Sequence, residues 1–171
     1  MKKNKNKGLA LSQSKGFTLI EILVVIGIIA VLATIVLIAI NPARQFAQAR
    51  DAQRVSNLNA ILNAIGQRIA DNKGVFEGEF EVGGVDHFCN PLLTTAGNIT
   101  TVARTSVTAT SSGELGCLVP TYIPALPTDP TGASGTDTGY NVFQDSIGRV
   151  HVIADETEAA ITRTTDIEVV R

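Results

Sequence analysis

Residues 17–40 read FTLIEILVVIGIIAVLATIVLIAI, a run of 24 residues in which Glu21 is the single charged side chain. As a helix this run is about 36 Å long, enough to cross a hydrocarbon core of roughly 30 Å. Leu, Ile and Val also suit buried strands, but strands rarely exceed about ten residues, so the length favours a helix. The run therefore predicts one membrane-spanning helix.

Charge is distributed unevenly on the two sides of this run. Five lysines lie within residues 1–16, whereas all 16 acidic residues lie at Glu21 or later. Without residues 1–16, nine cationic residues face 16 acidic ones, and the formal net charge falls from −2 to −7. Lysines before the run, and none close after it, place the N-terminus in the cytoplasm and the remainder outside. The acidic remainder argues against a nucleic-acid-binding surface, and the single run argues against a polytopic membrane protein.

The start of the run differs from an ordinary secretory signal, which is cleaved after its apolar stretch. Here a polar, basic segment ends at Lys15-Gly16, directly before Phe17. A lone carboxylate such as Glu21 costs roughly 2.5 kcal/mol or more deep in lipid, so it needs a shallow position or a cationic partner. One interpretation is a signal anchor whose Glu21 lies near the lipid headgroups.

The residues Gly16-Phe17-Thr18-Leu19-Ile20-Glu21, followed by an unbroken apolar run, support a second interpretation. They resemble the class III leader of type IV pilins and type II secretion pseudopilins, the prepilin-type N-terminal methylation motif. This resemblance implies that prepilin peptidase cuts between Gly16 and Phe17, and that Phe17 becomes the N-methylated mature N-terminus. It also implies that Glu21 pairs with the α-amine of a neighbouring subunit. Each group is costly in a low dielectric and each neutralises the other, so the pairing is physically reasonable.

The predicted fold is α+β and pilin-like: a long N-terminal helix, transmembrane in its first half, packs against a small antiparallel β-sheet head. We expect a cleaved cytoplasmic leader (1–16), a transmembrane and filament-core helix (17–40), an amphipathic helical spine (41–73) and a β-rich globular head (74–171). Asn41-Pro42 either starts a new helical segment or kinks one continuous helix.

The spine has a helical periodicity of apolar residues, with spacings of three and four: Val55, Leu58, Leu62, Ile65 and Ile69, with Ile61 beside them. We expect this stripe to pack against the head. We expect Arg50, Asp51 and Arg54 on other faces, and Gly74 to end the helix in a left-handed conformation.

The head contains five candidate strands: Val75–Val82, Ile99–Ala109, Tyr140–Gln144, Arg149–Ala154 and Asp166–Val170. Residues 145–148 (DSIG) predict a hairpin turn between the third and the fourth.

Cys89 and Cys117 are the only cysteines. In the cytosol they could be redox or metal-binding groups, but an even pair outside the membrane more often forms a disulfide. His87 and Cys89 alone fall short of the three or four ligands that zinc requires, and His151 stands apart in a candidate strand. We therefore predict a Cys89–Cys117 disulfide and no zinc site.

Residues 122–130 read YIPALPTDP and are followed by a polar loop. This region resembles the C-terminal part of major pseudopilin heads, which binds calcium in type II secretion pseudopilins. Asp129 and Asp137, with Ser134 and Thr138, offer the oxygen ligands that calcium takes. The alternative is a polar surface turn held by prolines, with no cofactor.

The sequence predicts a structural subunit of a type IV pilus-like filament and not an enzyme, since it contains no catalytic motif. We expect single-pass insertion in the bacterial inner membrane, followed by an extracellular or periplasmic filament. Expected partners are other copies and other pilins, prepilin peptidase and, indirectly, the assembly platform and motor ATPase; nucleic acid is not expected. The alternatives are a type II secretion pseudopilin, a minor or competence pilin with a binding head, and an enzyme tethered by a signal anchor.

Overall fold

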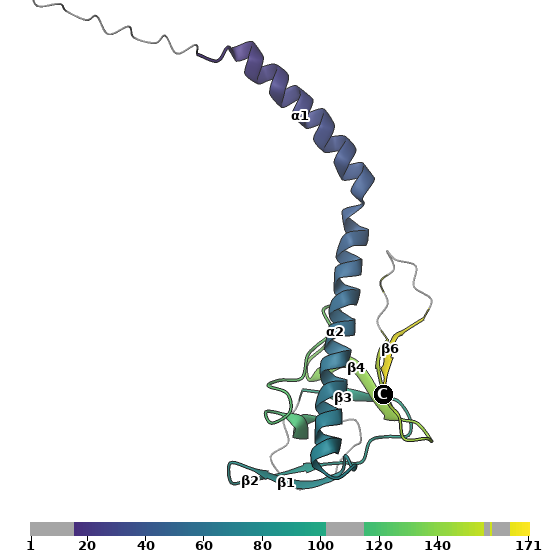
Figure 1. The fold of residues 1–171 in the computed structure, drawn as a ribbon. Helices are drawn as coiled ribbons and strands as arrows, with labels where there is room; N and C mark the ends of the chain where they lie inside the picture. The colour runs from purple at the N-terminus through teal and green to yellow at the C-terminus, as the bar shows by residue number, and fades with distance from the viewer. Residues whose placement is uncertain (1–15, 102–114, 156–157, 159–164) are drawn as a thin grey trace, which may run out of the picture. The chain divides into compact units, whose positions relative to one another are not determined.

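The computed structural model describes residues 16–101, 115–155, 158 and 165–171. The chain divides into two units, Met1–Pro42 and Ala43–Arg171, which we describe one at a time (Figure 1).

Helix α1 (Leu19–Ile40) accounts for most of the described part of the first unit. None of its 22 residues is buried, and its Leu, Ile and Val side chains are exposed on every face. The helix is about 33 Å long, which is enough for a membrane span. Among the described residues it is the one helix long and apolar enough to cross a membrane. A helix that is apolar all round needs lipid or protein on every side.

The apolar run ends at Asn41, which breaks the helix. Asn41 has φ 46° and ψ 81°, in the left-handed region that Asn tolerates better than most residues. The next helix, α2 (Pro42–Asp71), begins at the following residue, where the missing N–H of proline costs no hydrogen bond. Of the two expected arrangements, the structure has two helical segments and not one kinked helix. Asn41 ends the first helix in a left-handed conformation.

The buried face of α2 differs from the predicted stripe near its N-terminal end. Leu58, Leu62 and Ile65 are buried as expected, but Val55 is 41% exposed. Arg54, which we expected on another face, is completely buried in its place. Each residue of the buried face lies three or four positions from another member: Ala47, Asp51, Arg54, Leu58, Ile61, Leu62, Ala64, Ile65 and Arg68. The expectation that Asp51 and Arg54 lie away from the packed face was therefore wrong.

The exposed face of α2 carries no charged side chain between residues 45 and 70. Its exposed residues there are amides, small residues and two apolar ones: Gln45, Phe46, Gln48, Ala49, Ala52, Gln53, Val55, Ser56, Ala60, Asn63, Gln67 and Ala70. Of the charged residues in this segment, Asp51, Arg54 and Arg68 are buried and Arg50 is half-buried. The helix ends as expected: Asp71 is its last residue, and Gly74 (φ 95°) donates its N–H to the carbonyl of Ile69 at 2.8 Å.

Four antiparallel strands form the main sheet of the head, in the order β3-β4-β5-β6. They are β3 (Gly97–Thr100), β4 (Asp137–Gln144), β5 (Val150–Ala154) and β6 (Ile167–Val170). The predicted turn between β4 and β5 is present, with the Gly148 N–H donating to the carbonyl of Asp145 at 3.0 Å. β4 starts earlier than predicted, and residues 102–109 of the second candidate strand lie outside the described residues.

A second sheet consists of the hairpin β1 (Gly78–Val82) and β2 (Val85–Cys89). The first candidate strand is thus shorter than predicted, and β2 was not predicted. Gly83 and Gly84 form the turn with φ of 61° and 81°, the positive values that a tight two-residue hairpin requires. The Gly83-Gly84 pair, between two stretches with strand-forming residues, was the sequence signal for this hairpin.

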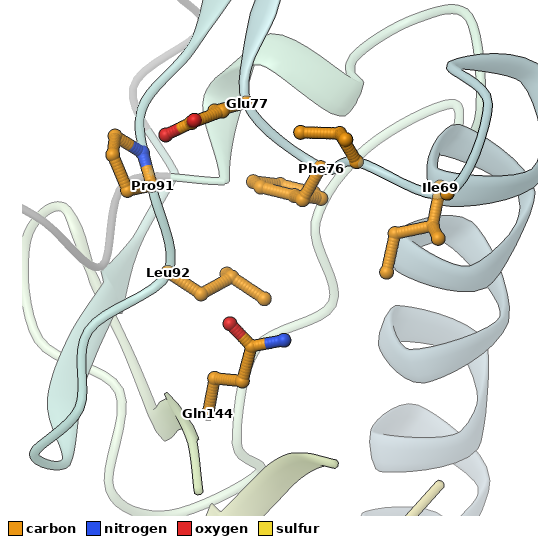
Figure 2. A pocket seen from close by; sticks show the side chains of 8 residues that line it. Ile69, Phe76, Glu77, Pro91, Leu92 and Gln144 are labelled. Atoms are coloured by element: carbon orange, nitrogen blue, oxygen red, sulfur yellow. The ribbon is translucent and has the colours of Figure 1, made fainter. Parts of the chain in front are cut away.

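The core of the head lies between α2 and the main sheet (Figure 1). It includes Leu58 and Ile65 from the helix, Tyr140 and Val152 from the sheet, and Leu118 from the short 3-10 helix η1 (Gly116–Leu118). At the C-terminal end of α2, Ile69, Phe76 and Leu92 line a cavity of about 240 Å³, with Gln144 at its edge (Figure 2). The predicted α+β class is confirmed, with a long apolar N-terminal helix, a second helix and two small antiparallel sheets.

Candidate processing and assembly site

The chain before α1 is outside any regular element. Gly16, Phe17 and Thr18 are non-helical and exposed, and Phe17 is 84% exposed. A Cβ atom placed on Gly16 would have no other atom within 4 Å. The Gly16–Phe17 peptide bond therefore lies in open, non-helical chain, a condition that a peptidase needs for access to a backbone carbonyl.

Thr18 and Glu21 start the helix by capping each other. Thr18 has extended backbone angles (φ −84°, ψ 149°), and its Oγ1 accepts the Glu21 N–H at 3.3 Å. In return, the Glu21 carboxylate oxygen Oε2 accepts the Thr18 N–H at 2.8 Å and the Thr18 hydroxyl at 2.7 Å. This reciprocal capping box satisfies two N–H groups that the first helical turn would leave unpaired. It also gives Glu21 hydrogen-bond donors from its own chain.

The comparison with protein families bears on this same segment. Residues 11–37 match the prokaryotic N-terminal methylation motif. This is the class III leader signature of type IV pilins and pseudopilins. It confirms the resemblance based on residues 16–21 and on the apolar run. No curated protein and no solved structure matches the chain.

The matched residues include the start of α1. The motif covers Gly16, Phe17 and Glu21, and the structure places all three within the non-helical start and the first turn of α1. The reciprocal Thr18–Glu21 contact was not predicted. Its signal was present in the sequence, because Thr followed three residues later by Glu, before an apolar run, is the pattern of a capping box.

In the head, the leading feature is a cluster of charges around Arg54. The Arg54 Nε donates to Asp129 Oδ2 at 2.6 Å, and Nη2 donates to Asp129 Oδ1 at 3.1 Å. Nη1 donates to Asp51 and to Glu158, both at 2.9 Å, and Nη2 donates to the Thr131 hydroxyl at 2.5 Å. One completely buried guanidinium thus contacts α2, the segment before β4 and the stretch between β5 and β6.

Arg50 extends this cluster toward solvent. Its Nε and Nη2 each donate to one carboxylate oxygen of Glu158 at 2.6 Å, a bidentate arrangement. These hydrogen bonds hold the pKa of Glu158 down at about 2; burial opposes them, and Arg54 adds to them. The pKa of Arg54 is raised, chiefly by its hydrogen bond to Asp129.

The Asp129 carboxylate accepts further hydrogen bonds from the backbone of its own loop. Its Oδ1 also accepts the N–H groups of Thr131 at 2.8 Å and Gly132 at 2.7 Å. Burial acts to raise the pKa of Asp129, but the hydrogen bonds from Arg54, Thr131 and Gly132 outweigh it and lower the pKa. The loop closes around this carboxylate: a Cβ on Gly139, at φ 77°, would lie 2.8 Å from the Asp129 Cβ.

The second candidate calcium ligand, Asp137, lies elsewhere in the same loop. Its Oδ1 accepts the Gly139 N–H at 2.9 Å, and its Oδ2 accepts the Asn98 amide at 3.1 Å. Within the described ranges, no three His, Cys, Asp or Glu side chains gather in a way that could hold a metal ion. The loop residues do not fit a calcium site, because the Asp129 carboxylate faces hydrogen-bond donors and the guanidinium of Arg54.

The remaining candidate residues serve the architecture of the head. Cys89 and Cys117 form a disulfide that joins the end of β2 to η1, with their Cα atoms 5.4 Å apart. His87 is buried and stacks on Phe80.

His151 lies between two carboxylates, with Nδ1 2.5 Å from Glu168 Oε1 and Nε2 3.2 Å from Asp145 Oδ2. These contacts raise the pKa of His151, Glu168 contributing most. The two carboxylates bind different ring nitrogens, so they do not converge on one metal position.

Proposed function

We propose that this protein is a structural subunit of a type IV pilus-like filament. In this proposal prepilin peptidase cuts the Gly16–Phe17 bond, Phe17 is N-methylated, and mature subunits polymerise through α1. The observation that carries the proposal is the methylation motif at residues 11–37 on a helix whose every face is apolar and exposed. Such a helix is soluble in lipid before assembly and can pack against copies of itself afterwards.

The anchored state follows from the charges on either side of α1. Lysines in residues 1–16 favour a cytoplasmic N-terminus, and the acidic head lies on the outer side of the inner membrane. Transfer from lipid to a filament gives little net hydrophobic gain, because lipid tails are as apolar as the neighbouring helices. Packing, the pairing of Glu21 with a neighbour's α-amine, and an external ATP-driven motor supply the remaining free energy.

Glu21 changes partner in this scheme. In the single chain its carboxylate accepts hydrogen bonds from Thr18, which lowers the cost of holding it at the start of an apolar helix. In the filament an α-amine from a neighbouring subunit provides a full opposite charge. The role of the protein is then structural and not enzymatic, with other copies and other pilins as its direct partners.

A second candidate within the same class is a pseudopilin of a type II secretion system. The proline-containing stretch before Asp129 favours it through its resemblance to major pseudopilin heads. The Arg54–Asp129 ion pair argues against it, because it occupies the loop where those heads bind calcium.

Electron microscopy of sheared surface fibres, with mass spectrometry of their main subunit, tests the proposal. We expect long fibres whose main subunit begins with N-methylated Phe17. A strain that lacks the gene should lose these fibres and regain them on complementation. Secretion lost without any loss of surface fibres would instead support the pseudopilin alternative, and a subunit that retains residues 1–16 would contradict both.

A further inference from the structure

His151 lies on the face of the main sheet that is turned away from the core. Along β5, the side chains of Val150, Val152 and Ala154 are buried, whereas His151 and Ile153 alternate with them and are half-buried. Successive side chains of a strand point to opposite faces of its sheet, so the histidine belongs to the outer face. It therefore contributes to the head through its contacts on that face and not through the apolar core.

Three segments contact the imidazole ring of His151. Phe143 of β4 is its directly paired neighbour, and the two rings stack with their centroids 4.4 Å apart. Glu168 of β6 is a diagonal neighbour, and its Oε1 lies 2.5 Å from Nδ1. Asp145, in the turn before β5, has Oδ2 3.2 Å from Nε2 and 2.7 Å from Nε of Arg149. The charged groups that the described part of the chain brings to this ring are thus two from the turn and one from β6.

The two carboxylates together require a doubly protonated ring. An ionised carboxylate only accepts hydrogen bonds, and a neutral imidazole has one N–H and one lone pair. A neutral His151 would donate to Glu168 or to Asp145, and its other nitrogen would turn a lone pair toward a carboxylate oxygen. The imidazolium form donates to both carboxylates at once. The raised pKa of His151, which Glu168 causes in the largest part, agrees with this form.

Loss of the proton leaves the two carboxylates in different situations. Asp145 keeps the Arg149 guanidinium, and it also accepts the N–H groups of Ile147 and Arg149 at 3.0 and 2.8 Å. For Glu168, the described part of the chain offers no hydrogen-bond donor besides His151. Its strand, β6, has β5 as its one partner among the described strands. The attachment of β6 therefore depends on the ring more than the attachment of the turn does.

We propose that His151 is a proton-dependent clamp that holds strand β6 on the main sheet. With both ring protons, the side chain binds Glu168 and Asp145 and keeps β6 against β5. Without one of them, β6 opens more often, while α2 and the rest of the sheet stay folded. A group whose folded pKa is raised contributes stability that is complete below its unfolded pKa, here about 6.5, and is lost as the pH rises through the folded value. This inference goes beyond the proposed function and does not depend on processing or filament assembly.

The test measures the ring protons and the opening of β6 separately, on the full-length mature protein in detergent micelles between pH 5 and pH 9. Nitrogen NMR of the labelled imidazoles reports the protons; the chain has two histidines, and His151→Gln assigns their signals. Hydrogen–deuterium exchange of residues 167–170, corrected for the intrinsic effect of pH on amide exchange, reports the opening. We expect both His151 nitrogens to be protonated at pH 6.

Protection of β6 should then fall as the ring loses its proton. The fall should equal the factor by which the proton affinity of His151 is higher in the closed strand than in the open one, because the two equilibria are linked. Amides of α2 between Leu58 and Ile65, which pack in the core, should keep their protection over the same pH range. They show that the head remains folded.

Two matched variants separate the clamp from the general charge of β6. Glu168→Gln removes the carboxylate that meets Nδ1, so β6 should be less protected than in wild type at pH 6, and its protection should vary less with pH. Asp166→Asn removes an exposed acidic charge two residues earlier and should keep the wild-type pH dependence. The proposal is overturned by a His151 with a single ring proton at pH 6, by β6 protection that is constant while the ring titrates, or by a Glu168→Gln variant that behaves as wild type.

Discussion

The two helices of this chain differ in the burial and the charge of their side chains. Helix α1 has 22 residues, none of them buried and only Glu21 charged. Helix α2 buries two guanidinium groups and a carboxylate on the side that faces the head, and its exposed face has no charge between residues 45 and 70. An apolar helix of this kind needs lipid or other helices around it, whereas the head provides the environment of α2. Variants of α1 should therefore change processing and assembly, and variants near Arg54 should change the stability of the head.

The largest expected effect is on processing. Gly16→Val should leave residues 1–16 attached and abolish assembly, because a β-branched side chain replaces the glycine at the cleaved bond. Intact mass and a denaturing gel measure this. Gly27→Val is the matched control within α1, where a Cβ meets no atom within 4 Å, and it should be processed normally. A Gly16→Val protein of normal mature length would contradict the proposal that the chain is cleaved between Gly16 and Phe17.

Glu21→Ala should reduce filament assembly without affecting membrane anchoring. We expect normal insertion and cleavage, but a filament yield of about one tenth of the wild-type yield or lower. The reason is the loss of a charge-assisted contact of about 1.5–3 kcal/mol. Filament yield is measured by shearing and quantitative blotting. Thr34→Val is the control, because the Thr34 hydroxyl donates within α1 to the Ala30 carbonyl at 2.9 Å. Unchanged filament yield in Glu21→Ala would argue against its pairing role.

Replacing both Cys89 and Cys117 by serine should affect the head alone. Closing the loop between residues that are 28 apart stabilises a chain by about 3–4 kcal/mol in the entropy model, and that amount should be lost. Tm and denaturant unfolding measure it, while cleavage at Gly16 should be unchanged. Two free thiols in the unreduced mature wild-type protein would show that the bridge does not form.

Gly139→Ala tests how tightly the loop closes around Asp129. Both Gly139 (φ 77°) and Gly148 (φ 89°) are left-handed, so alanine at either position should cost about 1–2 kcal/mol in backbone strain. At Gly148 the nearest atom to the new methyl group is 4.0 Å away, whereas at Gly139 it is 2.8 Å away. Gly139→Ala should therefore cost about 1–3 kcal/mol more than Gly148→Ala. Equal losses would mean that the loop relaxes easily.

The smallest expected effect is the acid sensitivity of the Arg54 cluster. Glu158 has its pKa lowered from 4.5 to about 2, and the pKa of Asp129 is lowered in the same direction. A group with a lowered folded pKa contributes stability above its unfolded pKa, and this is lost as the pH falls toward the folded value. The Tm should therefore decrease between about pH 4.5 and pH 2. Glu158→Gln should have a lower Tm than wild type at neutral pH, and its Tm should fall less steeply as the pH decreases. A Tm that falls with pH as steeply as in wild type would contradict the role of Glu158 in this acid sensitivity.

Much of the architecture could be predicted from local patterns. The length of residues 17–40 determined α1, the spacing of Leu58, Leu62 and Ile65 determined the packed side of α2, and Asp145–Gly148 marked one hairpin. Arg54 was missed because charged residues are usually exposed, and its three carboxylates lie up to 104 positions away. Only the folded chain brings such residues together. The sequence left open whether Asp129 lies in a calcium loop or in a polar surface turn, and it could not show that Asp129 is bound by Arg54, a residue on a different element.

The break at Asn41 also divides the helical hydrogen-bond ladder into two cooperative units. Pro42 has no N–H to donate, and the left-handed Asn41 does not continue the turn before it. Unwinding that begins at the end of α1 therefore cannot propagate residue by residue into α2, and the reverse also holds. Amide hydrogen exchange should show this as a step in opening free energy at residues 41–42. The head then keeps its exchange protection while α1 unwinds.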